Sequence, residues 1–376
     1  MSQSAHNVAC SMQHTRNFPD LPNEFKDLVV DSRAVGRPII ALAMGDPAGI
    51  SPELTAKAIA LPEIRAAAAL VVIGDARVLA AGARTARIAP DVEIRKPFAG
   101  PPADDNDSTV FIDLANLDPA RVETGQATPA GGAYALANFR FALGLAAAGH
   151  ADAVCFTPFN KAAMRSAHPG YDDEIGFTAE VLGTSGPASE FNVLDELWNA
   201  RVTSHVPLAA VAGALSRAAI VDAIRLTDRS LRDADVASPR IAVAGLNPHA
   251  GDGGNFGREE IDIIAPAVAD ARSEGIAAEG PFPADTVFVR ARGGGFDAVV
   301  TMYHDQGQIA MKLMGFDRGV TLLGGFPFPI CTPAHGTAYD IAGRGIANVG
   351  ATRAALLLAA RMAWARRARR AASTAA

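Results

Sequence analysis

The stretch PIIALAMGDPAGISPE (residues 38–53) decides the fold class. It opens with a run of apolar residues, which is typical of a strand that is buried on both faces of a sheet. Gly45-Asp46-Pro47 then stops the strand. Ser51 is a good helix N-cap and Pro52 fits the first helical position, so the residues that follow are predicted to form a helix. A buried strand followed directly by a helix is the repeating unit of an α/β protein.

The same unit recurs along the chain. Further apolar strands are predicted at residues 70–74, 110–112, 152–156, 241–245 and 297–303, and helices at 76–84, 128–148, 258–275 and 351–370. We therefore expect an α/β fold with a largely parallel sheet, in which ligands bind beyond the carboxyl ends of the strands. Four polar clusters each follow a strand and are expected to form the site: GDPAG, TPFNK, LNPHAGDGG and YHDQG.

The composition is that of an ordinary globular protein. The chain has 376 residues, which favours two domains, and its net charge of −6 argues against nucleic acid and anionic membrane as partners. Its three cysteines lie far apart, as expected in a reducing cytoplasm. Residues 1–35 carry no secretory signal pattern and are expected to be a poorly ordered extension. No apolar run approaches the roughly 20 residues of a membrane span.

The stretch VVTMYHDQGQIAMK (residues 299–312) ends a predicted strand on chemically active side chains. His304 is the main candidate, because imidazole titrates near neutrality and is the commonest neutral metal ligand. Asp305, Gln306 and Lys312 lie at the same strand end, which favours a site over a structural core histidine. The chain has only five lysines, so Lys312 and Lys161, each after a strand-end loop, are informative: unlike arginine, lysine can be tuned to gain or lose a proton.

Three other features are open to two interpretations. His205, in TSHVPL, is a lone histidine in an apolar segment, where a structural role is common. His249 and Asp252 lie in a glycine-rich strand-to-helix turn of the kind that binds phosphate, although its glycines do not match GxGxxG. The arginine cluster at 361–370 is predicted to lie in solvent and to interact with the negative end of the last helix.

Seven motifs, spanning residues 37–360 in order, resemble the 4-hydroxythreonine-4-phosphate dehydrogenases of pyridoxal phosphate biosynthesis. They are AMGDPAGISPE (43–53), TPFNKAAM (157–164), TSHVPL (203–208), GLNPHAGDGG (245–254), GPFPADTVF (280–288), YHDQG (303–307) and HGTAYDIAGRGIAN (335–348). The last also resembles the HGSAPDIAGKGIAN-type segment of isopropylmalate dehydrogenases.

The resemblance implies a two-domain fold like that of isocitrate and isopropylmalate dehydrogenases. We expect residues 36–125 and 305–376 to form the cofactor-side domain and residues 126–304 to form the dimerisation and substrate domain. The resemblance also implies a homodimer with its active sites in the cleft at the subunit interface. NAD or NADP would bind there without a Rossmann fingerprint.

The resemblance further implies a divalent metal (Zn, Mg, Mn or Co) held by three histidines. Two of the family's ligand motifs match His205 and His304. The third, GHTE, aligns with Gly176-Phe177-Thr178, so that Phe177 stands where a ligand is expected. Two imidazoles are an incomplete site, and Asp305, His168 or substrate oxygens are the candidates for completing it.

The phosphate contacts of the family are also altered. Lys312 matches the family's lysine, whereas Thr321 and Ile330 replace an asparagine and an arginine. Losing the arginine removes the main anion contact, so the sequence predicts a substrate without a phosphate. The terephthalate dihydrodiol dehydrogenases resemble this family, which makes a cis-dihydrodiol carboxylate an alternative substrate. A non-catalytic ligand-binding protein is the alternative from another functional class.

The hypothesised reaction oxidises a secondary alcohol of a hydroxy acid with NAD(P) and then releases carbon dioxide. His205 and His304 would orient and polarise the hydroxyl group, and Asp305 would orient His304. Lys312 would bind the substrate anion and Lys161 would carry a proton. Thr321, Asp46 and Asp285 are further substrate-binding predictions, and the cofactor-binding predictions are His249, Asp252, His335, Gly336, Asp340 and Asn348.

Overall fold

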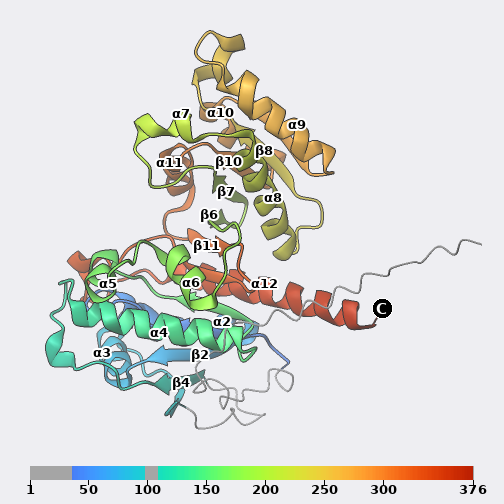
Figure 1. The fold of residues 1–376 in the computed structure, drawn as a ribbon. Coiled ribbons are helices and arrows are strands. Elements are labelled where there is room, and N and C mark those ends of the chain that lie inside the picture. Colours follow the sequence, from blue (N-terminus) through green and yellow to red (C-terminus); the bar gives the residue numbers. More distant parts are fainter. Residues whose placement is uncertain (1–35, 98–108, 376) are drawn as a thin grey trace, which may run out of the picture.

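The computed structural model describes residues 36–97 and 109–375 (Figure 1). Its strands form one sheet in the order β3-β4-β2-β1-β5-β12-β11-β6-β7-β10-β8-β9. The strands are β1 (Ile39–Ala43), β2 (Ala69–Gly74), β3 (Val92–Arg95), β4 (Thr109–Asp113), β5 (Ala153–Phe156), β6 (Ser189–Leu194), β7 (Leu197–Arg201), β8 (Arg240–Ala244), β9 (Ala277–Phe282), β10 (Ala298–Thr301), β11 (Val320–Gly324) and β12 (Ile330–Pro333). The N-terminal extension predicted at 1–35 lies outside the described residues.

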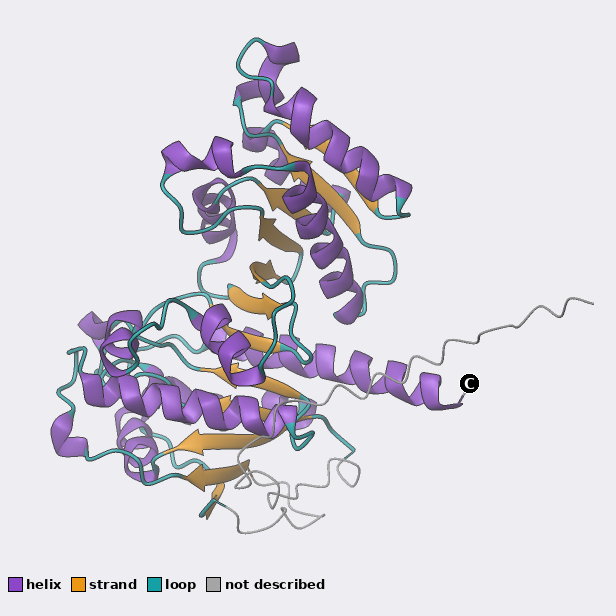
Figure 2. Ribbon diagram, viewed as in Figure 1, coloured by secondary structure: helices purple, strands orange, loops and turns teal. Residues whose placement is uncertain are grey.

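Helices lie on both faces of this sheet, as Figure 2 shows. They are α1 (Ser51–Ile59), α2 (Pro62–Ala67), α3 (Ala76–Ala86), α4 (Pro129–Ala147), α5 (Lys161–Ala167), α6 (Glu174–Leu182), α7 (Val211–Ala214), α8 (Arg217–Asp233), α9 (Ala265–Ser273), α10 (Ala284–Arg290), α11 (His304–Gly315) and α12 (Gly350–Ala375). Ile40 and Leu42 of β1 belong to one core and Ile39 and Ala41 to another. Both faces of the strand are therefore buried, and the predicted α/β fold with a largely parallel sheet is confirmed.

The apolar runs predicted from the sequence are all strands, but several strands were missed. β6, β7, β11 and β12 include the antiparallel pairs β11–β12, β11–β6 and β6–β7. Local capping was predicted with mixed success. Thr128 caps α4, accepting a hydrogen bond from Gly131 N, whereas Ser51 does not cap α1 and instead donates its hydroxyl hydrogen bond to Pro158 O at 2.7 Å.

The antiparallel strands in the middle reverse the direction of the sheet. β1, β5 and β12 are mutually parallel, and β7, β8 and β10 are mutually parallel but run the opposite way. The carboxyl ends of the two groups therefore lie at opposite edges. Each of the four polar clusters follows a strand, but GDPAG and TPFNK lie at one edge and LNPHAGDGG and YHDQG at the other.

Figure 1 shows two bodies joined through the middle strands of the sheet. The lower body contains α1 to α6 and α12, and the upper body contains α7 to α11. In the structure α4 and β5 pack on β1, so the division falls later in the chain than the boundary predicted at residue 126. No helix among the described residues is long and apolar enough to cross a membrane.

Candidate active site

Two histidines meet at the carboxyl ends of β7 and β10. These strands are parallel neighbours, so the loop that holds His205 and the start of α11, which holds His304, emerge at the same edge. The ring centroids of His205 and His304 are 5.5 Å apart. His205 adopts a left-handed backbone conformation, with φ of +50°, which is unusual for a residue with a side chain. The predicted pair of imidazoles is thus brought together.

Asp305 orients His304. Its Oδ1 lies 2.6 Å from Nδ1 of His304. An ionised carboxylate only accepts hydrogen bonds, so it favours a proton on Nδ1, and in the neutral imidazole this leaves Nε2 as the acceptor. The His304 side chain is about one-third exposed at 34%, so Nε2 is available to a substrate or a metal ion.

Gln306 and Gly307 fix this helix start on the sheet. Gln306 accepts a hydrogen bond from Met302 N at 2.7 Å and donates one to Gly245 O at 2.8 Å, joining the ends of β10 and β8. A Cβ at Gly307 would lie 2.1 Å from the side chain of Asn199, so only glycine lets α11 approach β7 this closely. The residues from His304 to Lys312 therefore lie on one helix, which begins at His304 itself.

The donors that the structure describes do not complete a metal site. Among residues 36–97 and 109–375, no three His, Cys, Asp or Glu side chains are grouped to hold a metal ion. Phe177 is buried in the lower body, where its ring packs on Phe139, Tyr171 and His168. His168 is bonded to Glu180 at 3.1 Å. Two imidazoles alone do not fit the ligand set of zinc or magnesium.

Lys312 lies eight residues beyond His304 on α11, about 12 Å along the helix axis. It lines a small cavity with Asn192, Val320 and Ala334. Thr321 pairs directly with Asn192 across β11 and β6. Lys312 and Asn192 thus line one cavity next to the segment that begins at His335, and Thr321 is the strand neighbour of Asn192.

Sequence reasoning missed Asn192 and the buried Arg201 beside it. Nη1 of Arg201 donates to Oδ1 of Asn192 at 2.9 Å, and the guanidinium also pairs with Glu190. Nε of Arg201 donates to Ser204 Oγ at 2.9 Å, one residue before His205. The network links Asn192, beside Thr321 and Lys312, to the loop that holds His205. The sequence carries no sign of it, because its members lie on two strands on either side of a turn and form no recognisable motif.

Asp46 holds two segments of the lower body together. Tyr339 donates its hydroxyl to Asp46 Oδ2, and Ala48 N donates to Oδ1 at 2.8 Å. Burial raises the pKa of Asp46, although these two hydrogen bonds oppose the shift. Asp46 lies at the predicted edge of the sheet. Both of its carboxylate oxygens accept hydrogen bonds from the protein, so its role in the structure is to hold the 337–341 segment in place. Tyr339 was missed by the sequence analysis, since its partner lies 293 residues away.

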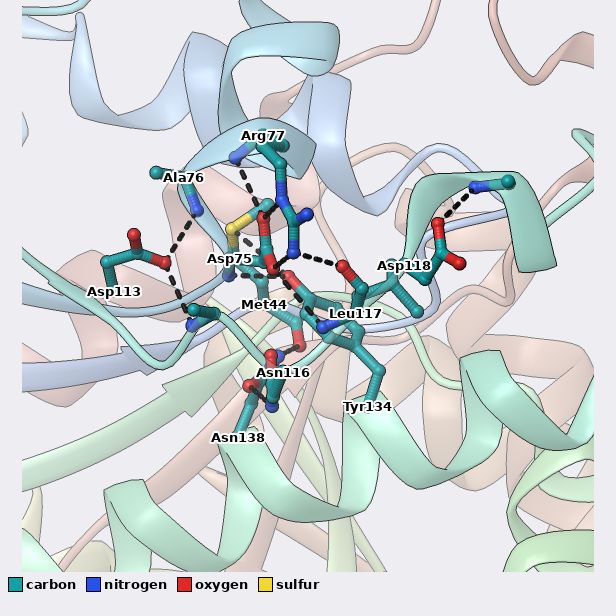
Figure 3. Close-up of polar contacts among 12 residues, drawn as sticks. Met44, Asp75, Ala76, Arg77, Asp113, Asn116, Leu117, Asp118, Tyr134 and Asn138 are labelled. Carbon is teal, nitrogen blue, oxygen red and sulfur yellow. Dashed lines mark hydrogen bonds and ion pairs between the residues drawn. The ribbon is translucent and has the colours of Figure 1, made fainter.

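A polar network beside Asp46 closes the ends of β1, β2 and β4 (Figure 3). Asp75 accepts hydrogen bonds from Arg77 and Leu117, and Asp113 accepts them from Ala76 and Ala115. Asn138 Nδ2 donates to Met44 O at 2.9 Å. Every carboxylate in this network has protein donors, so the network is structural and positions the loop that follows β1.

Lys161 begins α5, and its Nζ lies 3.0 Å from Glu174 Oε2. Burial would lower the pKa of Lys161, but the charge of Glu174 and the hydrogen bond to it, together with the charges of Glu190 and Asp173, outweigh this and the pKa is raised. The side chain is therefore an ammonium ion at neutral pH, suited to donate a proton or to bind an anion.

The predicted cofactor segment, residues 335–348, is anchored on α1. Lys57 donates to Gly345 O and Ala347 O at 3.2 and 2.7 Å, and Glu53 accepts from Ala347 N at 2.8 Å. Burial lowers the pKa of His335. The other three predicted residues of the segment are exposed, namely Gly336, Asp340 and Asn348.

The remaining predicted residues lie in the upper body. His249 and Asp252 are exposed in a turn whose residues 249–254 all have positive φ. Glu260 holds this turn, accepting hydrogen bonds from Leu246 N and Asn247 N. Asp285 is exposed in the first turn of α10, which packs on the same turn. Among the described residues, no hydrogen bond or ion pair joins His249, Asp252 or Asp285 to the 335–348 segment.

Comparisons with known proteins match this architecture over most of the chain. A Rhizobium meliloti protein named "Putative 4-hydroxythreonine-4-phosphate dehydrogenase 2" is 65% identical over 335 residues, 88% of this chain and 95% of the relative. The crystal structure of a Klebsiella pneumoniae 4-hydroxythreonine-4-phosphate dehydrogenase is 36% identical, with a TM-score of 0.75, and covers 87% of this chain and 99% of its own.

A further solved structure is a terephthalate 1,2-cis-dihydrodiol dehydrogenase from Burkholderia xenovorans LB400. It is 30% identical, with a TM-score of 0.60, over 86% of this chain and 98% of its own. The family described as pyridoxal phosphate biosynthetic protein PdxA matches residues 66–359. The chain therefore belongs to the PdxA family of dehydrogenases.

Proposed function

We propose that the protein uses NAD or NADP to oxidise the secondary alcohol of a small hydroxy acid, and that the resulting β-keto acid loses carbon dioxide. The observation that carries this proposal is the pair of imidazoles, His205 and His304, held 5.5 Å apart with Asp305 behind one of them. A free Nε2 on His304 is suited to accept the hydroxyl proton as the carbinol hydrogen leaves.

The steps after oxidation, loss of carbon dioxide and protonation of the product, require a proton donor. Bound NAD(P) would accept the hydride from the carbinol carbon. When the adjacent C–C bond breaks and carbon dioxide departs, its electron pair stays on the substrate as an enolate. The raised pKa of Lys161 keeps it protonated at neutral pH, so we assign to it the proton that reaches the enolate carbon. Lys161 then regains a proton from solvent, and His304 returns its own proton to solvent. No step is assigned to a metal ion, because this chain supplies only two of the ligands.

The substrate's second anionic group would be held by Lys312, Thr321 and Asn192. The names of the relatives with higher identity refer to a phosphate ester, and they do not support the sequence-based prediction of an unphosphorylated substrate. Asn192, directly opposite Thr321, supplies an amide near the position of the missing asparagine. We therefore propose a phosphorylated hydroxy acid as the first substrate to test.

A cis-dihydrodiol carboxylate is the second candidate, and Ile330 is the observation that favours it. This residue is fully buried in the core of the lower body, so no guanidinium reaches the anion pocket from β12. The ligand-binding alternative rests on Phe177 alone. In the structure Phe177 fills an aromatic core, a role that says nothing against catalysis at the histidine pair.

The protein is proposed to act as a homodimer in the cytoplasm. The predicted groups lie at two edges of the sheet within one chain, so a second copy would be needed to bring His304 opposite Lys161. Three exposed apolar residues follow one another about one turn apart along α11 and at its end. They are Ile309, Leu313 and Phe316, whose surfaces are 63%, 84% and 58% exposed. Such a stripe next to an incomplete site is suited to contact between copies.

The test is reduction of NAD and NADP by the purified protein, with and without Zn²⁺, Mg²⁺, Mn²⁺ or Co²⁺. 4-Hydroxythreonine-4-phosphate and a terephthalate-type cis-dihydrodiol would be compared side by side, with release of carbon dioxide measured in each. Turnover of the phosphate ester supports the first proposal. Turnover of the dihydrodiol alone would replace it with the second, and binding of both without cofactor reduction would contradict dehydrogenase activity.

A further inference from the structure

A cavity of about 460 Å³ lies where the two bodies meet, between α8, the β11–β12 connection and the C-terminal half of α12. Its size suits a small organic molecule. Part of its wall is apolar, from Phe326, Phe328 and Met362, and Ser230 contributes a hydroxyl group. No residue assigned above to catalysis or cofactor binding lines it.

The opposite wall carries three arginines, Arg366, Arg369 and Arg370, and one carboxylate, Asp233, and one of the arginines stands apart from its neighbours. Arg367 is paired with Asp152 at 2.7 Å and Arg369 with Asp233 at 2.9 Å. Arg366, which directly precedes Arg367 on α12, lines the cavity and has no hydrogen-bond or ion-pair partner among residues 36–97 and 109–375. The sequence-based prediction that the whole cluster lies in solvent is wrong for Arg366, which is partly buried.

Leaving a guanidinium partly buried without an anion is costly. Burial, together with the positive charge of Arg370, lowers the pKa of Arg366 to about 10, although the charges of Asp233 and Asp152, which are paired with other arginines, oppose the shift. A smaller cavity of about 180 Å³ adjoins the first and shares Arg366, Arg370 and Phe328. The side chain thus separates two hollows and is accessible from both, whereas a purely structural arginine would be directed at a carboxylate.

We propose that this cavity binds a small organic anion, with an apolar ring or chain against Phe328 and Met362 and a carboxylate or phosphate group on Arg366. The planar guanidinium fork matches such oxyanions in a bidentate way. Because Ser230 belongs to the upper body and Arg366 to the lower, the ligand contacts both bodies and biases how they are arranged.

The experiment is isothermal titration of the full-length protein with phenyl phosphate, benzoate, inorganic phosphate and neutral benzamide at constant ionic strength. Wild-type protein is compared with Arg366→Met and with Arg361→Met, an exposed arginine of the same helix that lines neither cavity. A Lys312→Met variant separates this cavity from the active site, which also attracts anions.

We expect one or both aromatic anions to bind wild type, Arg361→Met and Lys312→Met alike, and Arg366→Met at least about tenfold more weakly. The stronger of phenyl phosphate and benzoate identifies the preferred oxyanion. Benzamide and inorganic phosphate should bind more weakly than either, because each lacks one half of the ligand. The melting temperature of unliganded Arg366→Met should be no lower than that of wild type, since an unpaired buried charge is removed.

Four results would overturn the proposal. These are no binding of either aromatic anion at millimolar concentration, equal binding by Arg366→Met, loss of binding in Lys312→Met instead, or a marked loss of thermal stability in unliganded Arg366→Met. The last would mean that Arg366 has a structural partner in the chain. None of these results depends on whether the protein turns over a hydroxy acid, so failure here is distinguishable from failure of the proposed function.

Discussion

His304 depends on its neighbour in the chain for its chemistry. With Asp305 Oδ1 at 2.6 Å from Nδ1, the imidazole presents Nε2 toward the site. Replacing His304 with Ala should lower kcat/KM by about 10²- to 10⁴-fold, the contribution of a positioned acid–base group. The circular dichroism spectrum should not change, because the side chain is partly exposed and does not pack in the core.

Asp305→Asn tests the orienting role separately, with an expected loss of about 10- to 100-fold. His150→Ala, in the loop before β5, is the control histidine. A folded His304→Ala protein with wild-type turnover would contradict the assignment of the site.

His335 should make stability depend on pH. Burial lowers its pKa in the folded state below the ordinary value of 6.5. Between that lowered value and 6.5 the unfolded chain binds more protons than the folded chain, so stability present above pH 6.5 is lost as the pH falls. Melting temperatures of wild type and His335→Gln would be measured from pH 7.5 to 5.5. As the pH is lowered, the melting temperature of wild type should fall relative to that of the variant. Parallel pH profiles would contradict this.

At the scale of elements, the left-handed turn after β8 is held by the buried carboxylate of Glu260. Gly251 has a φ of +81°, and a Cβ there would lie 2.7 Å from Oε2 of Glu260. Gly253 has a φ of +65° but open space around it. Gly251→Ala should therefore cost about 1–3 kcal/mol of unfolding free energy, and Gly253→Ala about 1 kcal/mol from backbone strain alone. Urea unfolding midpoints would show the difference, and equal midpoints would mean that the contact with Glu260 is unimportant.

Elements with a strong local signal were predictable from the sequence. The run before Gly45 is apolar on both faces, and Thr128 with Pro129 marks the start of α4, so both elements were predicted. The strands β6 and β7 were missed because they carry Glu190 and Arg201, which can be buried only by pairing with each other. The start of α11 was missed because Gly307 weakens the helical pattern. Glycine is needed at position 307 because a larger residue would collide with Asn199 of β7.

The candidate site was predictable only in part, for the same reason. His304, Asp305 and Lys312 are near one another in sequence, and chemistry alone points to them. The partners of Asp46 and Lys161, namely Tyr339 and Glu174, are fixed by tertiary contacts that leave no local pattern. The direction reversal in the sheet was likewise invisible, and it places the predicted groups at two edges.

For the whole molecule, this division of the site has a consequence that can be measured. His304→Ala and Lys161→Met would each inactivate a different half of the site. If a complete site takes His304 from one copy and Lys161 from another, a mixed dimer of the two variants has one doubly defective site and one intact site. Mixing the inactive proteins after mild dissociation should then restore about one quarter of wild-type activity, because about half of the dimers are mixed and each has one intact site of two.

Leu313→Glu in both variants is the control, since a charge in the exposed stripe of α11 should prevent association and abolish the restored activity. Light scattering would report the expected change from dimer to monomer. If the mixture stays inactive while light scattering shows mixed dimers, each site is built within one chain, and the two bodies must close on each other to bring Lys161 to the histidine pair.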